Sequence, residues 1–202
     1  MKVLKMLNVN TDSVMLPLNL LGKDVSIVFQ SQVITNVIST SLNKNKQMPF
    51  NIVLVEPEIP NNTGNIGRVS LASGSVLHLV KPFGFELSDA RLKRAGLDYW
   101  KHITVKIYES LDEFLAMNKD KEMVFLSSAA KKSYVSIDYK DDLFFVFGKE
   151  SVGLPKELVA NNTDKLYKIP IHSPHVRSLN LANAVSIVVF EGLRSMAVSE
   201  NS

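Results

Sequence analysis

The sequence predicts an α/β fold in which a mainly parallel sheet is flanked by helices. The 202 residues are 46% apolar, which is enough for one sizeable core. From residue 50 onward, short β-branched and aromatic runs alternate with segments of helical spacing, as they do in parallel sheets. Several of these runs stop abruptly at a polar loop that leads into a helix. Open α/β sheets bind their ligands at loops of this kind.

Six apolar runs are predicted as strands, each bounded by small, rigid or polar residues. They span residues 50–55, 76–80, 104–108, 123–127, 142–147 and 166–169. Two prolines, Pro57 and Pro60, are expected to keep the first polar loop out of a helix, so Asn62 or Thr63 is the expected N-cap there. Further helices are expected after Ser88, from Ser110 to Met117, after Leu154–Pro155, and from Leu179 to about Met196.

Composition excludes several classes of protein. The chain has no cysteine, which excludes disulfides, thiolate metal sites and a cysteine nucleophile, and which fits a reducing, cytoplasmic setting. Histidines show no metal-ligand spacing beyond the His172/His175 pair, so no metal is expected. No apolar run approaches the roughly 18 residues of a membrane helix, so no membrane segment is expected.

Residues 1–47 differ from the rest of the chain. They carry five lysines and two acidic residues, so they hold the whole net charge of +3, and their apolar residues follow no sustained period. We expect an N-terminal extension that is poorly ordered, or an over-long reading frame with the natural start at Met48. Residues 48–202 are then the functional domain.

The last predicted helix carries an unusually wide apolar stripe. Its members are Leu181, Ala184, Val185, Val188, Val189 and Leu193. One packing face of a helix needs a narrower stripe, so a second buried surface is expected. A homodimer interface would supply that surface.

Three segments have amino-acid sequences that are more specific than a pattern of polar and apolar residues. They are P-N-N-T-G-N-I-G-R (60–68), F-G-K-E-S-V-G-L-P (147–155) and I-P-I-H-S-P-H-V-R-S-L-N-L-A-N-A-V (169–185). In this order they resemble the three motifs of the SPOUT superfamily of RNA 2′-O-ribose methyltransferases. The opening N-I-V-L-V-E-P-E-I-P and the central R-L-K-R-A-G-L-D-Y-W resemble its TrmL (YibK) branch, which modifies the ribose of the wobble nucleotide, position 34, of tRNA.

The resemblance implies a fold, a cofactor and partners. The fold is a sheet with a C-terminal deep trefoil knot, and the methyl donor is S-adenosylmethionine, bound in that knot. The partners are the anticodon stem-loop of tRNA and a second copy of the chain. The cofactor-binding positions fall on Leu126, Gly148, Ile169 and Ser178.

The resemblance also places catalytic positions on Arg68, Asn65, Glu150 and Asn180. Arginine is a poor base because its pKa exceeds about 12, so we expect Arg68 to stabilise the developing alkoxide and to grip the neighbouring phosphate. A salt bridge in the first turn of its helix is the structural alternative. Glu150 could orient Arg68 or could cap nearby backbone N–H groups. Ser178 could also be the N-cap of the last helix.

A basic segment before Tyr99 and Trp100 is a candidate RNA contact. Arg91, Lys93 and Arg94 are expected to lie on one short helix and to bind phosphate beside the two aromatic rings. The alternative is an ordinary solvated helix face.

Two other functions compete with ribose methylation. A non-catalytic knot protein could bind RNA as an assembly factor, although the intact candidate catalytic residues argue against lost activity. A nucleotide-dependent oxidoreductase is disfavoured because the sequence lacks the G-x-G-x-x-G fingerprint.

Overall fold

The computed structural model of the protein describes residues 13–20, 23–30, 50–86 and 98–199. The chain divides into two units, Met1–Gln47 and Met48–Ser202. In the first unit, β1 (Ser13–Leu20) pairs antiparallel with β2 (Lys23–Gln30). The sequence analysis did not predict this hairpin.

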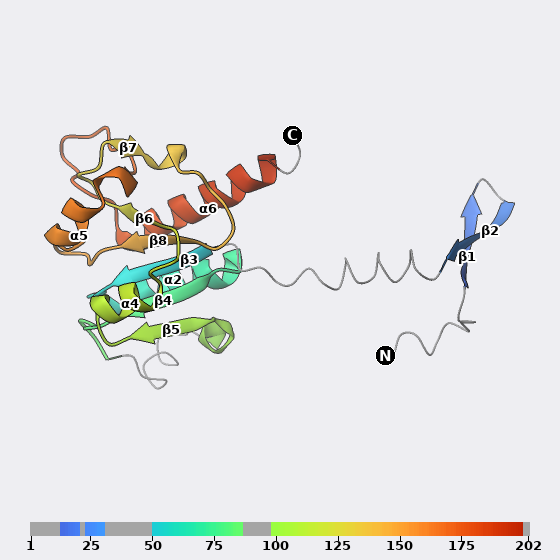
Figure 1. The fold of residues 1–202 in the computed structure, drawn as a ribbon, viewed down its shortest axis with the longest axis horizontal. Helices are drawn as coiled ribbons and strands as arrows, with labels where there is room; N and C mark the ends of the chain where they lie inside the picture. The colour runs from blue at the N-terminus through green and yellow to red at the C-terminus, as the bar shows by residue number, and fades with distance from the viewer. Residues whose placement is uncertain (1–12, 21–22, 31–49, 87–97, 200–202) are drawn as a thin grey trace. The chain divides into compact units, whose positions relative to one another are not determined.

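The second unit is built on a seven-stranded sheet in the order β5-β4-β3-β8-β6-β9-β7 (Figure 1). Every pairing between its neighbouring strands is parallel, which confirms the predicted α/β class. The strands are β3 (Phe50–Val55), β4 (Val76–Val80), β5 (Val105–Tyr108), β6 (Met123–Leu126), β7 (Lys132–Ser133), β8 (Leu143–Phe147) and β9 (Leu166–Lys168).

The predicted strands agree closely with the structure. β3 and β4 have the predicted bounds, and β5, β6, β8 and β9 each differ by one residue at one end. Continuous apolar runs are typical of strands buried on both faces, and β3, β4 and β8 are buried along their whole length. The two-residue strand β7 was not predicted, because it is too short to show a period.

Helices and 3₁₀ turns connect the strands. They are α2 (Pro60–Ser73), η1 (Asp98–His102), α4 (Leu111–Met117), η2 (Tyr134–Ser136), α5 (Lys156–Asn161), η3 (Thr163–Lys165) and α6 (Leu181–Ser199). Ser110 caps α4 as predicted, since its side chain accepts a hydrogen bond from the Glu113 N–H. The predicted basic helix of Arg91, Lys93 and Arg94 lies outside the described residues.

The start of α2 corrects the sequence prediction. The helix begins at Pro60, with Ile59 as N-cap, and no side chain caps it. Proline suits the first helical position because its missing N–H has no partner there in any case. Asn62 and Thr63 are therefore buried residues of the first turn and not N-caps.

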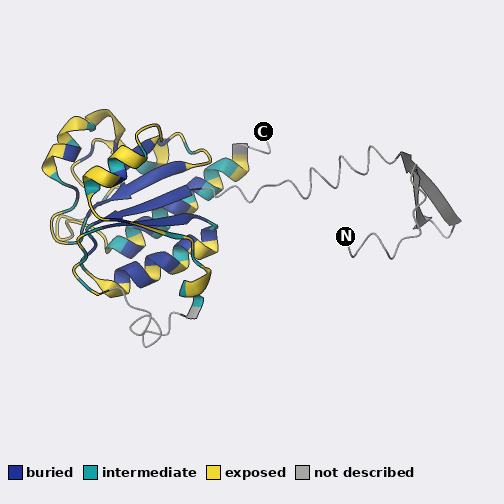
Figure 2. Ribbon diagram, turned by 60° about the horizontal axis from the view of Figure 1, so that its bottom comes forward, coloured by how far each residue is buried: buried dark blue, intermediate teal, exposed yellow. Residues whose placement is uncertain are grey.

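Alternate residues of the central strand β3 enter two separate cores. Phe50, Ile52 and Leu54 pack with Ile66 of α2 and with α6 on one face. Val53 and Val55 of the same strand pack with α4 and α5 residues on the other face. The central strands are consequently buried between helices, as the dark blue arrows in Figure 2 show. Because every pairing in the sheet is parallel, the carboxyl ends of the strands lie at one edge.

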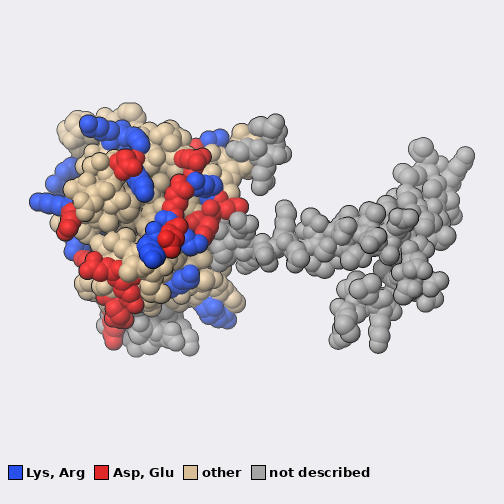
Figure 3. Space-filling view, in the orientation of Figure 1, with Lys and Arg blue, Asp and Glu red and all other residues tan. Residues whose placement is uncertain are grey.

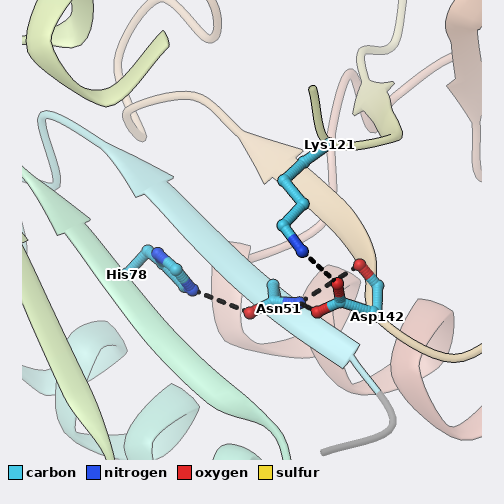
Figure 4. A network of polar contacts seen from close by, with 4 residues as sticks. All are labelled: Asn51, His78, Lys121 and Asp142. Atoms are coloured by element: carbon cyan, nitrogen blue, oxygen red, sulfur yellow. Dashed lines mark hydrogen bonds and ion pairs between the residues drawn. The ribbon is translucent and has the colours of Figure 1, made fainter. Parts of the chain in front are cut away.

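A polar network crosses β4 and β3 and ends at Asp142, beside the start of β8; it is buried at His78 and Asn51 (Figure 4). The imidazole of His78 is fully buried, with Nε2 2.9 Å from Asn51 Oδ1 and Nδ1 2.9 Å from the Tyr108 hydroxyl. Asn51 Nδ2 donates to Asp142 Oδ1 at 2.9 Å, and Lys121 Nζ lies 2.6 Å from Asp142 Oδ2. Burial lowers the pKa of His78 to about 4, so the ring stays neutral at neutral pH.

Helix α6 packs against α2 and the sheet. Val185, Val188 and Val189 are completely buried within the single chain, whereas Phe190 is 50% exposed. The stretch Leu181–Val198, with a mean hydropathy of 1.4, is by length and composition long enough to cross a membrane. The expectation that no run reaches this length is therefore wrong, although core helices also meet this description. The trefoil knot stays a prediction.

Candidate active site

The loops after β3, β6, β8 and β9 meet at the carboxyl edge of the sheet. From β3 the chain runs outward to β4, whereas β8, the neighbour on the other side, arrives from a distant part of the chain. Open α/β sheets bind ligands where the connections diverge in this way. The residues of the second and third sequence motifs begin at these strand ends.

The second motif forms a tight turn after β8. Lys149 and Gly153 bridge the turn, and the Gly153 N–H donates to the Lys149 carbonyl oxygen at 2.9 Å. A Cβ atom on Gly148 would lie 2.0 Å from the Gly153 carbonyl carbon, and Gly153 itself has a φ of 75°. Only glycine fits both positions, since one lacks space and the other is left-handed.

The carboxylate of Glu150 binds the chain at the entrance to α2. Its Oε2 accepts from the Glu58 N–H at 2.8 Å, and its Oε1 accepts from the Ile59 N–H at 3.2 Å. Oε1 also accepts from Asn62 Nδ2 at 2.9 Å. Glu150 therefore binds backbone N–H groups, as one sequence alternative proposed, but these groups belong to the two residues that precede α2, about 90 positions earlier in the chain. A negative charge is favourable at that helix end.

The same two loops are joined by reciprocal contacts. The Glu58 carboxylate accepts from the Ser151 N–H at 3.0 Å and from the Ser151 hydroxyl at 2.9 Å. Glu56 pairs with Lys149 at 2.8 Å, and this hydrogen bond and charge raise the pKa of the Lys149 ammonium. Glu56 has a φ of 51°, which is uncommon outside glycine. Backbone strain of this kind occurs at functional sites where the surrounding contacts hold it.

Asn62 connects the first motif to the third. Its Oδ1 accepts from Asn180 Nδ2 at 2.9 Å, while its own Nδ2 binds Glu150. Asn180 Oδ1 accepts from the Ala182 N–H at 2.9 Å, so Asn180 caps α6. Ser178 is therefore not the N-cap, which was the other alternative for that residue.

The sequence analysis placed two asparagines, Asn65 and Asn180, among the catalytic residues. Asn180 takes part in the contacts above, and the role of Asn65 stays a prediction. Asn65 is exposed on α2, whereas Asn62 is buried among the motif residues. Pro60 was the signal that could have identified Asn62. A helix that starts at Pro60 puts Asn62 in its first turn, beside the loops that the helix end faces.

A cavity of about 590 Å³ opens between these loops. Six of the predicted site residues line it: Leu126, Gly148, Glu150, Ile169, Ser178 and Asn180. Asn62, Ser127, Tyr167 and Arg177 also line it and were not predicted. The volume is in the range of pockets for small molecules and cofactors. The structure thus gathers three segments that are far apart in sequence around one ligand-sized space.

Arg68 is not among the residues that line the cavity. It is exposed on α2, and its guanidinium carbon lies 4.4 Å from the centre of the Tyr99 ring. His172 and His175 are exposed and do not line the cavity either. Within residues 50–86 and 98–199, no three His, Cys, Asp or Glu side chains are grouped as they would be around a metal ion.

The SpoU rRNA Methylase family matches residues 49–190, which is well over half of the chain. The chain belongs to this family. The match confirms the resemblance to the RNA methyltransferases that the three motifs indicated.

Individual relatives carry names that are more specific than that of the family. A protein of Geobacillus stearothermophilus, named provisionally as a tRNA (cytidine(34)-2′-O)-methyltransferase, is 44% identical over 153 residues, which cover 74% of this chain and 97% of its own. A protein of Saccharophagus degradans carries this name without qualification and is 43% identical over 148 residues, or 73% of this chain and 96% of its own.

Solved structures agree with these relatives. One, described as giving structural insights into the 2-OH methylation of C/U34 on tRNA, is 40% identical and has a TM-score of 0.69, covering 76% of this chain and 99% of its own. An AdoMet-bound rRNA methyltransferase from Sinorhizobium meliloti is 26% identical, with a TM-score of 0.65 over 80% of this chain and 70% of its own.

Proposed function

We propose that the protein is an S-adenosylmethionine-dependent tRNA methyltransferase that methylates the 2′-oxygen of nucleotide 34, a cytidine or uridine. The relatives named above support this substrate, since their similarity to this chain extends over nearly the whole length of each relative. The single observation that carries the proposal is the linkage of Glu150, Asn62 and Asn180 beside the cavity. It unites the three motifs in one site.

The cavity fits the proposed methyl donor. Its volume suits a nucleoside-sized ligand, and Gly148 lines it from a turn too tight for a side chain at that position. We expect the loop residues Leu126, Gly148 and Ile169 to hold the adenosine part through backbone groups, and Ser178 to bind through its hydroxyl. When bound, S-adenosylmethionine supplies an already activated sulfonium methyl group, so we expect no metal requirement.

The chain's own residues then have to align the ribose hydroxyl and assist its deprotonation. Glu150 and Asn62 hold the entrance of α2, and with it the helix that carries Arg68. The Arg68 guanidinium has five N–H donors, which suit a backbone phosphate and a developing alkoxide. The proton goes to the substrate phosphate or to water, because an arginine does not lose its own.

Exposed features of the domain support the proposed partners. Phe190 is half exposed on α6, a helix whose opposite side is completely buried, so we propose a homodimer formed through α6. On the face in Figure 3, acidic and basic side chains are intermixed, so tRNA contact there would depend on local groups. Arg91, Lys93 and Arg94 remain candidates for such contact. We propose a cytoplasmic enzyme without a membrane partner.

The first unit is proposed to be dispensable. A fragment beginning at Met48 is expected to fold and to bind S-adenosylmethionine as tightly as the full chain, because the site residues all lie beyond residue 50. Calorimetry with both proteins checks this, and a clear loss of affinity in the fragment would give Met1–Gln47 a part in the site.

Mapping of ribose methylation in total tRNA tests the proposed function. Cells with and without the protein are compared at nucleotide 34, and the modification is expected only where the protein is present. An unchanged map, together with tRNA binding by the purified protein, would support the non-catalytic RNA-binding alternative.

A further inference from the structure

Arg68 lies at a place where its side chain needs external support. It is exposed on the surface of α2, six residues and about 9 Å along the helix from Asn62. An exposed arginine has several rotatable bonds, so its guanidinium samples many positions unless a neighbour holds it. Among the described residues, the neighbour in contact with this guanidinium is the ring of Tyr99.

Tyr99 is itself fixed to the helix that carries Arg68. Its hydroxyl donates to the Gly64 carbonyl oxygen at 2.9 Å. The next residue, Trp100, packs so closely on α2 that a Cβ atom at Gly67 would lie 2.6 Å from its ring. The Tyr99 hydroxyl is therefore fixed to α2 one helical turn before Arg68, and the packing of Trp100 fixes the neighbouring residue.

Stacking on an aromatic ring and pairing with a carboxylate leave different groups of a guanidinium free. A carboxylate partner would occupy the N–H groups at the edge of the guanidinium. An aromatic ring binds the flat face by cation–π attraction and leaves the N–H donors in the plane available. Those donors are the groups that a phosphate or a developing alkoxide needs.

We propose that Tyr99 is a positioning residue for Arg68, holding the guanidinium by its face so that its N–H edge meets the RNA during methyl transfer. This inference rests on the function proposed above. A displacement of about 1 Å in a catalytic group can cost about a hundredfold in rate, so loss of the ring is expected to lower kcat rather than to weaken cofactor binding.

Two substitutions separate the ring from the hydroxyl. Tyr99→Leu removes the ring, and we expect kcat on tRNA to fall at least about tenfold, with S-adenosylmethionine affinity within about twofold. Tyr99→Phe keeps the ring and is expected to retain kcat within about threefold. Tyr134→Leu, which removes a half-buried tyrosine packed on the first core, is the matched control for general loss of packing.

A double substitution tests whether Tyr99 acts through Arg68. In an Arg68→Ala background, Tyr99→Leu is expected to lower kcat by less than about twofold, because the group it positions is already missing. A purely structural Tyr99 would give the same fold-loss in kcat in both backgrounds. That result would overturn the proposal.

A measurement that needs no activity distinguishes this inference from the proposed function. In the NMR spectrum, the Arg68 Nε–H proton is expected to show an upfield ring-current shift in the wild type and in Tyr99→Phe, and to lose it in Tyr99→Leu. A wild-type protein without that shift contradicts the stacking, whatever the activity. A shifted proton in a protein that methylates no tRNA refutes the proposed function, and the role of Tyr99 in transfer with it.

Discussion

Replacing Glu150 by glutamine tests the linkage that joins the three motifs. The carboxylate accepts from the Glu58 and Ile59 N–H groups and from Asn62 Nδ2, at 2.8, 3.2 and 2.9 Å. Glutamine has one acceptor oxygen, so either the Glu58 N–H or the other two donors would face its NH₂ group. Hydrogen bonds to a charged group contribute about 1.5–3 kcal/mol each, and the carboxylate adds up to about 1 kcal/mol at a helix N-terminus.

Partial exposure lets water replace part of this loss, so we expect Glu150→Gln to lower the free energy of unfolding by about 2 kcal/mol. The melting temperature of a domain of this size should then fall by about 4–8 °C. Methyl transfer should fall more than tenfold, because the entrance of α2 loses its fixed position. Thermal unfolding and radiolabelled methyl transfer measure the two effects.

Glu157→Gln is the matched control, since Glu157 is exposed in the first turn of α5. It makes the same chemical change away from the cavity and should leave melting temperature and turnover almost unchanged. The reasoning is refuted if Glu150→Gln melts within about 1 °C of the wild type and transfers methyl groups within about twofold of it.

Four further outcomes are expected. Arg68→Ala should leave S-adenosylmethionine affinity within about threefold by calorimetry while methyl transfer falls at least about a hundredfold, because Arg68 lies outside the cavity lining. Ser178→Ala should weaken that affinity about fivefold, as one lost hydrogen bond of about 1 kcal/mol predicts; unchanged binding would remove Ser178 from the pocket. Phe190→Glu should give folded monomers in sedimentation, and a monomeric wild type at micromolar concentration would contradict the interface. The folded pKa of His78, about 4, lies below the usual 6.5, so the unfolded state takes up the proton first as pH falls. Urea unfolding should therefore show about 3 kcal/mol lost between pH 7 and pH 4 that His78→Gln does not lose, and equal pH dependence in both would exclude His78 as its source.

The burial of α6 residues corrects the sequence argument for the dimer. The width of the apolar stripe was explained by a second buried surface, but Val188 and Val189 are completely buried against their own chain. A charge at either valine would disrupt the core of the single chain and would not report on association. Phe190, on the exposed side, is the residue that can test the interface.

The strands could be predicted because their signal is local. Phe50–Val55 and Val76–Val80 are continuous apolar runs, and burial on both faces of the sheet is what such runs require. The start of α4 could also be predicted locally, because Ser110 caps the helix through a hydrogen bond within one turn. Each of these features depends on residues a few positions apart.

The arrangement of the site depends on contacts that no local pattern contains. Asn62 binds Glu150 across 88 positions and Asn180 across 118 positions. These contacts exist because β8 inserts beside β3, and the order of strands in a sheet leaves no periodic trace in the sequence. The family resemblance supplied six of the residues that line the cavity, but it did not single out Asn62.

Methyl transfer by the purified protein tests the central claim most directly. The protein, S-adenosylmethionine and tRNA lacking ribose methylation are incubated together, and each modified nucleotide is then mapped. We predict one 2′-O-methyl group, on nucleotide 34, and its loss in Arg68→Ala. A protein that binds the cofactor yet leaves nucleotide 34 unmodified, or that methylates another position instead, would contradict the function proposed for this site.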